Sequence, residues 1–244
     1  MSDFYSNRIA ILGLGLIGGS IARGLKRANN AIFISAYDQN DTALSQALSE
    51  GVINQICTLD DLARESNILV IALPPITAAA LIPKLAAVVG EHCIVTDVAS
   101  VKSTIMDVVN EQPLSFQQRF VPGHPIAGSE QSEFQSSTPE LFQDRNVILI
   151  PHTKINPKAL AVVNELWREL GANILGMEIA KHDEVLAMTS HLPHLLAYTI
   201  VDAIVGQQQS EDIFRYAAGG FADFSRLASS NAKMWSDIFV TNSE

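Results

Sequence analysis

The fold is decided by one segment near the N-terminus, Arg8-Ile-Ala-Ile-Leu-Gly-Leu-Gly-Leu-Ile-Gly-Gly-Ser20. Its first residues predict a short apolar strand over 8–12, and the glycines that follow fit the pattern G-x-G-x-x-G. In such a turn Gly13 permits the sharp bend, Gly15 lets the backbone approach a pyrophosphate, and Gly18 allows close packing of helix on strand. Since apolar residues then recur at helical spacing, the segment predicts a strand, a phosphate-binding turn and a helix.

Three further residues define the expected dinucleotide site. Leu16 and Ile17 stand at the start of the helix, where backbone N–H groups without helical partners face an anion. Asp38 follows the last glycine of the motif by twenty residues, at the end of the next expected strand, where a carboxylate accepts hydrogen bonds from a ribose 2′-hydroxyl. That carboxylate would repel a 2′-phosphate, so we expect NAD rather than NADP. The alternative is a plain glycine turn with Asp38 capping a loop.

Strand and helix patterns alternate through the first 178 residues. Alternation of this kind implies parallel strands joined by right-handed helical crossovers, and ligands at the carboxyl ends of the strands. The expected fold is α/β, with a doubly wound, Rossmann-type parallel sheet that runs to about residue 178. A helix with Asp41 as its N-cap is expected after the second strand. The strands are expected at 8–12, 32–37, 68–73, 93–96, 146–150 and 173–175.

The remainder of the chain has a different character. Residues 181–205 predict one long helix with apolar side chains around most of its circumference, which must be enclosed. The other residues of this region are too few to enclose it, so we expect a partner subunit or further sequence to cover it. We therefore divide the chain into a nucleotide-binding domain, 1–178, and a smaller all-helical substrate and dimerisation domain, 179–244.

Composition excludes several classes of protein. The chain has 244 residues, of which 48% are hydrophobic, so it can form a sizeable core. Its 16 Lys and Arg against 26 Asp and Glu give a net charge of −10, which opposes binding to nucleic acid or anionic lipid. The N-terminus lacks signal-peptide features and the two cysteines lack metal or disulfide spacing, so we expect a cytoplasmic protein. The apolar run 68–89 contains three prolines and predicts a strand, a turn and a helix rather than a membrane span.

Five segments, in order along the chain, resemble the prephenate/arogenate (cyclohexadienyl) dehydrogenase family of tyrosine biosynthesis. The glycine turn is shared with many dehydrogenases, whereas the histidine-containing segments are more particular to this family. The segments are Gly13-Leu-Gly-Leu-Ile-Gly-Gly-Ser20, Thr96-Asp-Val-Ala-Ser-Val-Lys102, Gly123-His-Pro-Ile-Ala-Gly-Ser-Glu130, Thr189-Ser-His-Leu-Pro-His194, and Gly219-Gly-Phe-Ala-Asp-Phe-Ser-Arg226 with Met234-Trp235.

The resemblance implies an NAD(P)-dependent oxidative decarboxylation of prephenate to 4-hydroxyphenylpyruvate and CO2, or of arogenate to tyrosine. It implies that His124 hydrogen-bonds the ring hydroxyl and assists its deprotonation, a role that suits a neutral imidazole. It also implies that Ser100 shares the substrate hydroxyl and orients this histidine. The alternatives are a loop histidine bonded to backbone and a serine that caps a helix. Lys102 receives no role.

Substrate anchoring is implied for residues in the C-terminal part. Arg226 matches the family arginine that binds a substrate carboxylate, and its planar fork suits bidentate recognition. His194 is expected to contact the substrate, with His191 lining the same pocket and Trp235 packing nearby, although a core tryptophan and core histidines are the alternatives. His182 and Asp183 are expected to be structural or interdomain polar groups.

The residues that follow His124 do not indicate whether prephenate or arogenate is the preferred substrate. Ser129 and Glu130 fall where relatives carry a Thr-Glu or Ser-Glu pair near the substrate side chain. Glu130 would pair with the ammonium of arogenate or bond the pyruvyl group of prephenate through water; the alternative is a solvated loop acid.

Other interpretations remain open at this stage. A zinc site at His182, His191 and His194 is disfavoured because the H-E-x-x-H pattern is absent, so no metal is expected. A β-hydroxyacid dehydrogenase would need a catalytic lysine in the helical part, where Lys181 and Lys233 are poor equivalents. A non-enzymatic NAD-binding regulator would use the same glycine turn. The helical part is shorter than is usual for the family, so we expect a truncated form, a minimal variant or the dehydrogenase part of a larger fusion. The apolar circumference of the helix over 181–205 predicts a homodimer. The substrate is expected to be a small molecule.

Overall fold

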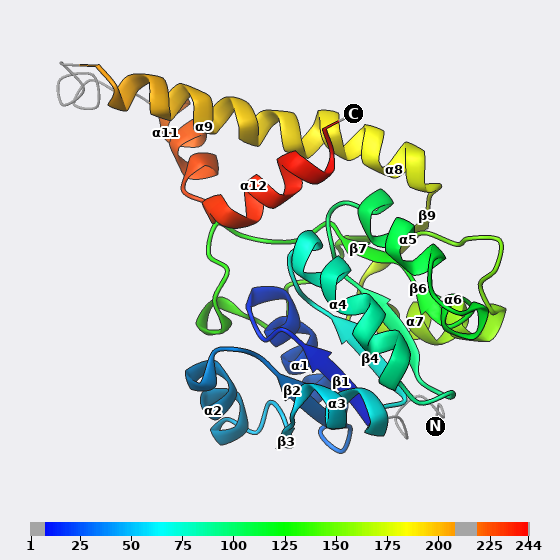
Figure 1. The fold of residues 1–244 in the computed structure, drawn as a ribbon. Coiled ribbons are helices and arrows are strands. Elements are labelled where there is room, and N and C mark those ends of the chain that lie inside the picture. The colour runs from blue at the N-terminus through cyan, green and yellow to red at the C-terminus, as the bar shows by residue number, and fades with distance from the viewer. Residues whose placement is uncertain (1–7, 208–218, 244) are drawn as a thin grey trace.

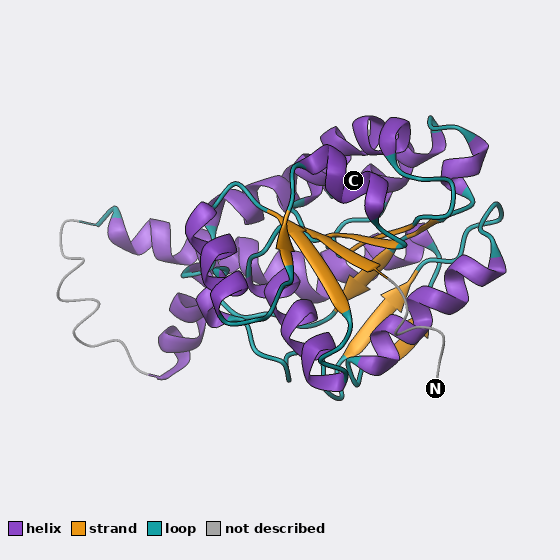
Figure 2. Ribbon diagram, turned by 90° about the horizontal axis from the view of Figure 1, so that it is seen from below, coloured by secondary structure: helices purple, strands orange, loops and turns teal. Residues whose placement is uncertain are grey.

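The computed structural model describes residues 8–207 and 219–243, and its centre is a six-stranded sheet (Figures 1 and 2). All five strand pairs are parallel and the order is β3-β2-β1-β4-β5-β6. The order reverses between β1 and β4, which confirms the doubly wound sheet and places the ligand crevice there. The strands are β1 (Arg8–Leu12), β2 (Phe33–Tyr37), β3 (Gln55–Ile56), β4 (Ile68–Ile71), β5 (Ile94–Asp97) and β6 (Phe120–Val121).

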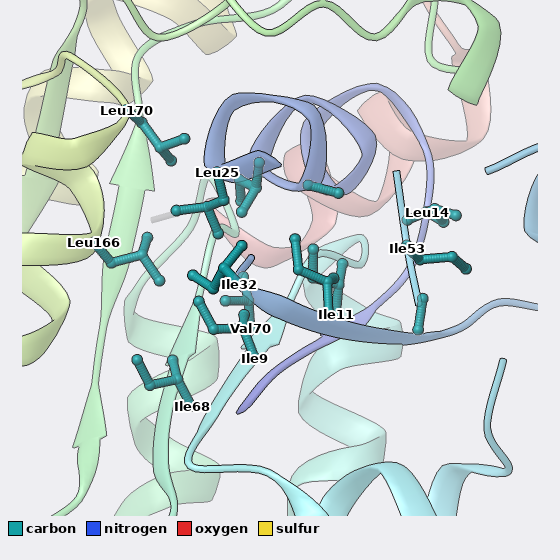
Figure 3. Close-up of a cluster of buried hydrophobic side chains, with 14 of the residues drawn as sticks. Ile9, Ile11, Leu14, Leu25, Ile32, Ile53, Ile68, Val70, Leu166 and Leu170 are labelled. Carbon is teal, nitrogen blue, oxygen red and sulfur yellow. The ribbon is translucent and has the colours of Figure 1, made fainter. Parts of the chain in front are cut away.

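Helices cover both faces of this sheet, because its strands are apolar on both sides. Ile9 and Ile11 of β1 pack towards one layer of helices (Figure 3). Ala10 and Leu12 pack towards the other layer. Burial of a side chain such as Ile11 stabilises the fold by about 1.5–3 kcal/mol. The first layer is α1 (Leu16–Ala28), α2 (Asp41–Ser49) and α7 (Pro157–Glu169); the second is α3 (Leu59–Glu65), α4 (Pro75–Val88), α5 (Ser103–Asn110) and α6 (Leu114–Gln117).

A second, three-stranded sheet was not expected from the sequence. It consists of β7 (Gly123–Pro125), β8 (Asn146–Leu149) and β9 (Asn173–Gly176), with β7 antiparallel to β8 and β8 parallel to β9. The expected extension of the first sheet to about residue 178 is therefore wrong. Pro122 follows β6 without an N–H for the ladder, and the chain turns there to pair with β8. His124 consequently lies on a strand rather than in a loop.

The helix expected over 181–205 is present as a nearly continuous rod with one irregularity (Figure 1). It comprises α8 (Ile179–Leu186), a π-helical turn η3 (Ala187–His191) and α9 (Leu192–Val205). Pro193 has no N–H to continue the regular ladder, and a wider turn accommodates the loss. The chain then returns through α11 (Gly219–Ala228), which packs on α9, and α12 (Ala232–Thr241), which contacts α4.

Two smaller expectations also change. The N-cap of α2 is Asn40 rather than Asp41, since its side chain accepts hydrogen bonds from the N–H groups of Thr42 and Ala43 at 3.1 and 3.2 Å. The apolar run 68–89 forms β4 and α4, as expected, although β4 ends at Ile71. No helix within residues 8–207 and 219–243 is both long and apolar enough to cross a membrane.

Candidate active site

The glycine turn sits between the carboxyl ends of β1 and β4. Gly13 has φ +95°, and a Cβ on it would lie 2.4 Å from the carbonyl oxygen of Ala72. A Cβ on Gly18 would lie 2.0 Å from the carbonyl oxygen of Gly13. Side chains are therefore excluded at both positions, as expected for this turn.

Asp38 lies directly against the glycine turn. Its Oδ2 accepts a hydrogen bond from the Leu14 N–H at 2.5 Å, and its Oδ1 accepts one from the Asn40 N–H at 2.8 Å. The carboxylate is thus held half-buried at the end of β2, the position from which such a group reaches a ribose.

The segment after β7 covers part of the same turn. The Leu16 N–H donates to the Ser132 carbonyl oxygen at 2.8 Å, and a Cβ on Gly15 would lie 2.7 Å from that oxygen. The first intrahelical bond of α1 runs from the Gly19 N–H to Gly15, so the N–H groups of Ile17 and Gly18 precede it. The turn fits a dinucleotide pyrophosphate at the N–H groups of Ile17 and Gly18.

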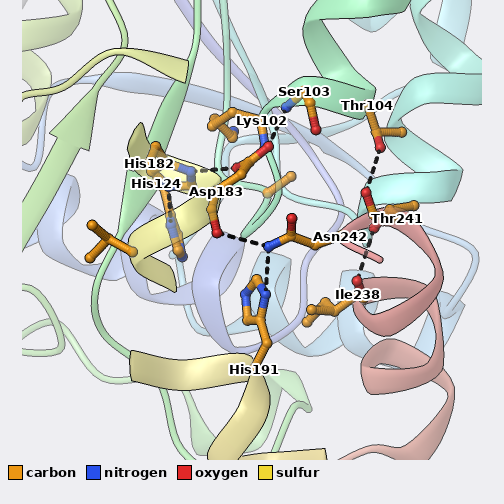
Figure 4. A network of polar contacts seen from close by, with 12 residues as sticks. Lys102, Ser103, Thr104, His124, His182, Asp183, His191, Ile238, Thr241 and Asn242 are labelled. Atoms are coloured by element: carbon orange, nitrogen blue, oxygen red, sulfur yellow. Dashed lines mark hydrogen bonds and ion pairs between the residues drawn. The ribbon is translucent and has the colours of Figure 1, made fainter. Parts of the chain in front are cut away.

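His124 is buried on β7, where it pairs with Ile148 of β8 and is 8% exposed. Its Nδ1 lies 2.8 Å from the Nε2 of His182, whose Nδ1 lies 2.6 Å from Oδ1 of Asp183 (Figure 4). Burial, and then the proximity of His182 and of the Lys102 ammonium, lower the pKa of His124 well below its ordinary value. The ring is therefore uncharged at neutral pH.

Asp183 joins α8 to the start of α5. Its Oδ1 accepts from the Lys102 N–H at 2.9 Å and its Oδ2 from the Ser103 N–H at 2.8 Å, so it caps α5 from another element. Burial favours the neutral acid, but hydrogen bonds from His182 and Ser103 outweigh burial and hold the pKa of Asp183 well below its usual range. The side chain is a carboxylate that only accepts.

Lys102, to which the sequence assigned no role, is fully buried between β5 and β7. Its ammonium forms an ion pair with Asp97 and donates to the Gly123 carbonyl oxygen at 2.7 Å. Asp97 in turn accepts from the Gly123 N–H at 3.3 Å. Burial lowers the pKa of Lys102, and the charge of Asp97 opposes that effect. This pair fixes β7, and with it His124, against the loop that contains Ser100.

No hydrogen bond joins Ser100 to His124 in this structure, although the resemblance implies that Ser100 orients this histidine. Ser100 is half-buried in the loop between β5 and α5, and its hydroxyl has no hydrogen-bond partner among the described residues. The partner of His124 Nδ1 is His182 instead. Sequence reasoning missed this pairing, because the two histidines are 58 residues apart and meet only in the tertiary structure.

Two of the expected pocket residues, His191 and His194, lie around Trp235, which is 7% exposed. His194 stacks on its indole ring with centroids 3.7 Å apart, and the His194 Nδ1–H donates to the Ser190 carbonyl oxygen at 2.9 Å. The Nδ1 of His191 accepts from Asn242 at 2.9 Å, and its buried Nε2 has no protein partner in the described part of the chain. Burial lowers the pKa of His191 to about 4.

Arg226 lies near this group on α11. Burial, and to a lesser extent the Arg226 charge, lower the pKa of His194. The Arg226 guanidinium also lies 3.8 Å from the Glu130 carboxylate, with the two side chains 59% and 40% exposed. Ser129, beside Glu130, donates from its hydroxyl to the Gln131 carbonyl oxygen at 3.0 Å. The loop after β7 therefore extends from the glycine turn to the helical part.

The histidines and lysines of the competing interpretations have other partners. His182, His191 and His194 have different partners, and the described residues contain no cluster of three His, Cys, Asp or Glu side chains that could hold a metal ion. Lys181 pairs with Glu184 at the surface, and Lys233 pairs with Asp237 while its own side chain is 80% exposed.

Both parts of the chain match domains of a known protein family. Residues 21–176 match the nucleotide-binding domain of prephenate dehydrogenase, and residues 178–244 match the prephenate dehydrogenase dimerization domain.

Among curated relatives, a cyclohexadienyl dehydrogenase from Zymomonas mobilis is 36% identical over 244 residues, covering 96% of this chain and 80% of that protein. A prephenate dehydrogenase from Bacillus subtilis is 34% identical, covering 97% of this chain and 64% of that protein. Among solved structures, Aquifex aeolicus prephenate dehydrogenase in complex with hydroxyphenyl propionate and NAD+ is 35% identical with a TM-score of 0.88, covering 97% of this chain and 82% of that one. The chain belongs to the prephenate/cyclohexadienyl dehydrogenase family of NAD-binding oxidoreductases.

Proposed function

We propose that this protein catalyses the NAD-dependent oxidative decarboxylation of prephenate to 4-hydroxyphenylpyruvate and CO2. The observation that carries the proposal is a buried, uncharged imidazole, His124, whose strand is fixed beside the carboxyl end of β5. The relatives named as prephenate and cyclohexadienyl dehydrogenases support the substrate class. We assign nucleotide binding to residues 1–178, and substrate binding and dimerisation to residues 179–244.

The residues of the chain account for each part of this reaction. Bound NAD supplies a hydride acceptor at its nicotinamide ring. As hydride leaves the ring carbon that bears the hydroxyl, His124 accepts the hydroxyl proton, with Ser100 as a second polar contact to that oxygen. Loss of the ring carboxylate as CO2 leaves its electron pair in the ring, which becomes aromatic, and the proton returns to the phenolic oxygen. Arg226 holds a substrate carboxylate, and His194, His191 and Trp235 line the remainder of the pocket.

Arogenate is the alternative substrate, either alone or together with prephenate. The similarity to a cyclohexadienyl dehydrogenase supports arogenate as a possible substrate. Glu130 is the acidic group that would pair with the ammonium of arogenate. Since Glu130 lies beside Arg226, it is positioned to bias the choice between a pyruvyl and an alanyl side chain, and Ser129 lies next to it.

The reduction of NAD in the presence of each substrate tests the function. We expect absorbance from reduced nicotinamide to rise on mixing the protein with NAD and prephenate, with release of CO2. A signal with arogenate but not with prephenate would identify arogenate as the substrate in place of prephenate. The absence of a signal with both compounds would favour a β-hydroxyacid dehydrogenase or a non-enzymatic NAD-binding regulator.

Cofactor preference is expected to depend on Asp38. We propose that NAD is preferred over NADP, because a carboxylate beside the glycine turn repels a 2′-phosphate. Asp38→Ser should weaken NAD use and reduce the ratio of kcat/KM for NAD to that for NADP by about tenfold, the equivalent of ~1.4 kcal/mol. If the ratio of kcat/KM for NAD to that for NADP is unchanged in Asp38→Ser, Asp38 does not bind the ribose hydroxyl.

We further propose a homodimer formed through the helical part. Of the α9 side chains only Ala197 is buried in the described chain, while Leu195 and Leu196 are 45% and 49% exposed. Apolar exposure of this extent on one helix is typical of an interface. Analytical ultracentrifugation at micromolar concentration is expected to show a dimer, and a monomer under these conditions would contradict the proposal.

A further inference from the structure

His124, His182 and Asp183 form a buried, linear chain of hydrogen bonds (Figure 4). The exposed fractions of the three residues are 8%, 0% and 7%. The three side chains come from β7 and α8, and the carboxylate at the end of the chain is additionally held by the N–H groups of Lys102 and Ser103. The carboxylate therefore cannot turn away from His182 without leaving the start of α5 uncapped.

The acceptor at one end decides the direction of every bond in this chain. A carboxylate can only accept, so the Nδ1 of His182 must donate to Asp183. The Nε2 of a neutral His182 then carries a lone pair and must accept from the Nδ1–H of His124. The remaining nitrogen of His124, Nε2, is therefore left without a proton.

We propose that His182 and Asp183 are positioning residues that set the tautomer of His124, so that its Nε2 is the atom that accepts the proton of the substrate. The proposal rests on the proposed function for the identity of that substrate. The proton moves from the substrate hydroxyl to Nε2, while the Nδ1–H stays in place and shares the new positive charge with His182. Asp183 stabilises this charge through the intervening ring, in the way that a carboxylate directly bonded to a histidine does in a catalytic triad.

The groups around His124 show why a nearby carboxylate matters for its protonation. The buried Lys102 ammonium, His182 and His191 all disfavour a proton on His124, and Asp183 favours it. Lys102 is itself paired with Asp97. Asp183 is therefore the acidic group whose charge helps His124 to become positive during the reaction.

The tautomer can be read directly in the ligand-free protein. In protein containing 15N-labelled histidine, long-range 1H–15N correlation spectra distinguish protonated from unprotonated ring nitrogens, and the His124→Asn variant identifies the His124 signals among the six histidines. We expect a protonated Nδ1 and an unprotonated Nε2 on His124 near pH 7. A protonated Nε2 on His124, with His182 carrying protons on both nitrogens, would overturn the proposal. This spectrum is informative even if neither prephenate nor arogenate is turned over.

Asp183→Asn tests the same claim through kinetics. The asparagine amide can donate to His182 Nδ1, which reverses the chain and places the proton of His124 on Nε2. We expect kcat to fall by about 10²–10⁴-fold, by analogy with the loss caused by a wrong tautomer in a catalytic triad, with KM little changed. Asp237→Asn is the matched control, because Asp237 is also a buried carboxylate of the helical part but pairs with Lys233. Wild-type kcat in Asp183→Asn would overturn the proposal.

If Asp183→Asn fails to fold, two variants of His182 test whether its hydrogen bonds position His124. Glutamine at position 182 offers one acceptor and one donor in a single side chain, whereas leucine offers neither. We expect His182→Leu to lose most of kcat while binding NAD normally, and His182→Gln to recover at least tenfold of that loss. Equal activity in both variants, whether high or low, would show that hydrogen bonding by His182 does not position His124. His152→Leu, at a half-buried histidine bonded to the Phe120 carbonyl, is the control.

Discussion

Replacing His124 with asparagine is expected to lower kcat by about 10²–10⁴-fold, the usual contribution of a positioned proton acceptor. Binding of NAD should be unaffected, because the glycine turn and Asp38 do not contact this side chain. Isothermal titration with NAD provides that control, and stopped-flow absorbance of reduced nicotinamide provides the rate. A variant that retains wild-type turnover would exclude His124 as the acceptor.

The pH dependence of the same pair of proteins is a second part of this prediction. Protonated imidazole cannot accept a proton, so activity must fall as the pH falls through the pKa of His124. Because burial lowers that pKa, kcat/KM of the wild type should stay level from neutral pH to below 6.5 and decline only at more acid pH. His124→Asn should lack this decline. An acid limb that survives the substitution would belong to another group.

Replacing Arg226 with alanine is expected to raise KM for prephenate by about 10- to 100-fold, with a smaller effect on kcat. The physical reason is the loss of charge-assisted hydrogen bonds to a substrate carboxylate, worth about 1.5–3 kcal/mol in total. Because the chain has a net charge of −10, the remaining protein does little to attract a dianion.

Arg27→Ala is the matched control for this substitution. Arg27 is also a surface arginine paired with a glutamate, Glu140, but it lies on α1. Steady-state kinetics of the two variants separate a site-specific effect from a general loss of positive charge. If Arg226→Ala lowers kcat and leaves KM unchanged, Arg226 is not an anchor for the bound substrate.

The nucleotide half could be predicted because its signals are local. The glycine turn and Asp38 lie within one strand-turn-helix-strand unit, and each residue type is required by backbone conformation or by charge. The structure adds that the Ser132 carbonyl oxygen contacts this turn. That contact joins segments more than a hundred residues apart, and no pattern in the sequence predicts it.

The contacts of the substrate half could not be predicted from the sequence, because they join residues far apart along the chain. The short strand β7 could not be recognised, because its three residues include a glycine and a proline and its pairing with β8 is long-range. The hydrogen bond between His124 and His182 was missed for the same reason. His182 and Asp183 were expected to be structural polar groups, and only tertiary packing shows that they point at His124.

In the proposed reaction, the Nε2 of His124 receives the proton of the substrate hydroxyl. The most direct measurement is a crystal structure of this protein with NAD and hydroxyphenyl propionate, whose phenolic oxygen stands for the hydroxyl oxygen of the substrate. We predict that His124 Nε2 lies about 2.6–3.2 Å from that oxygen. A phenolic oxygen directed away from His124, with no water between them, would contradict it.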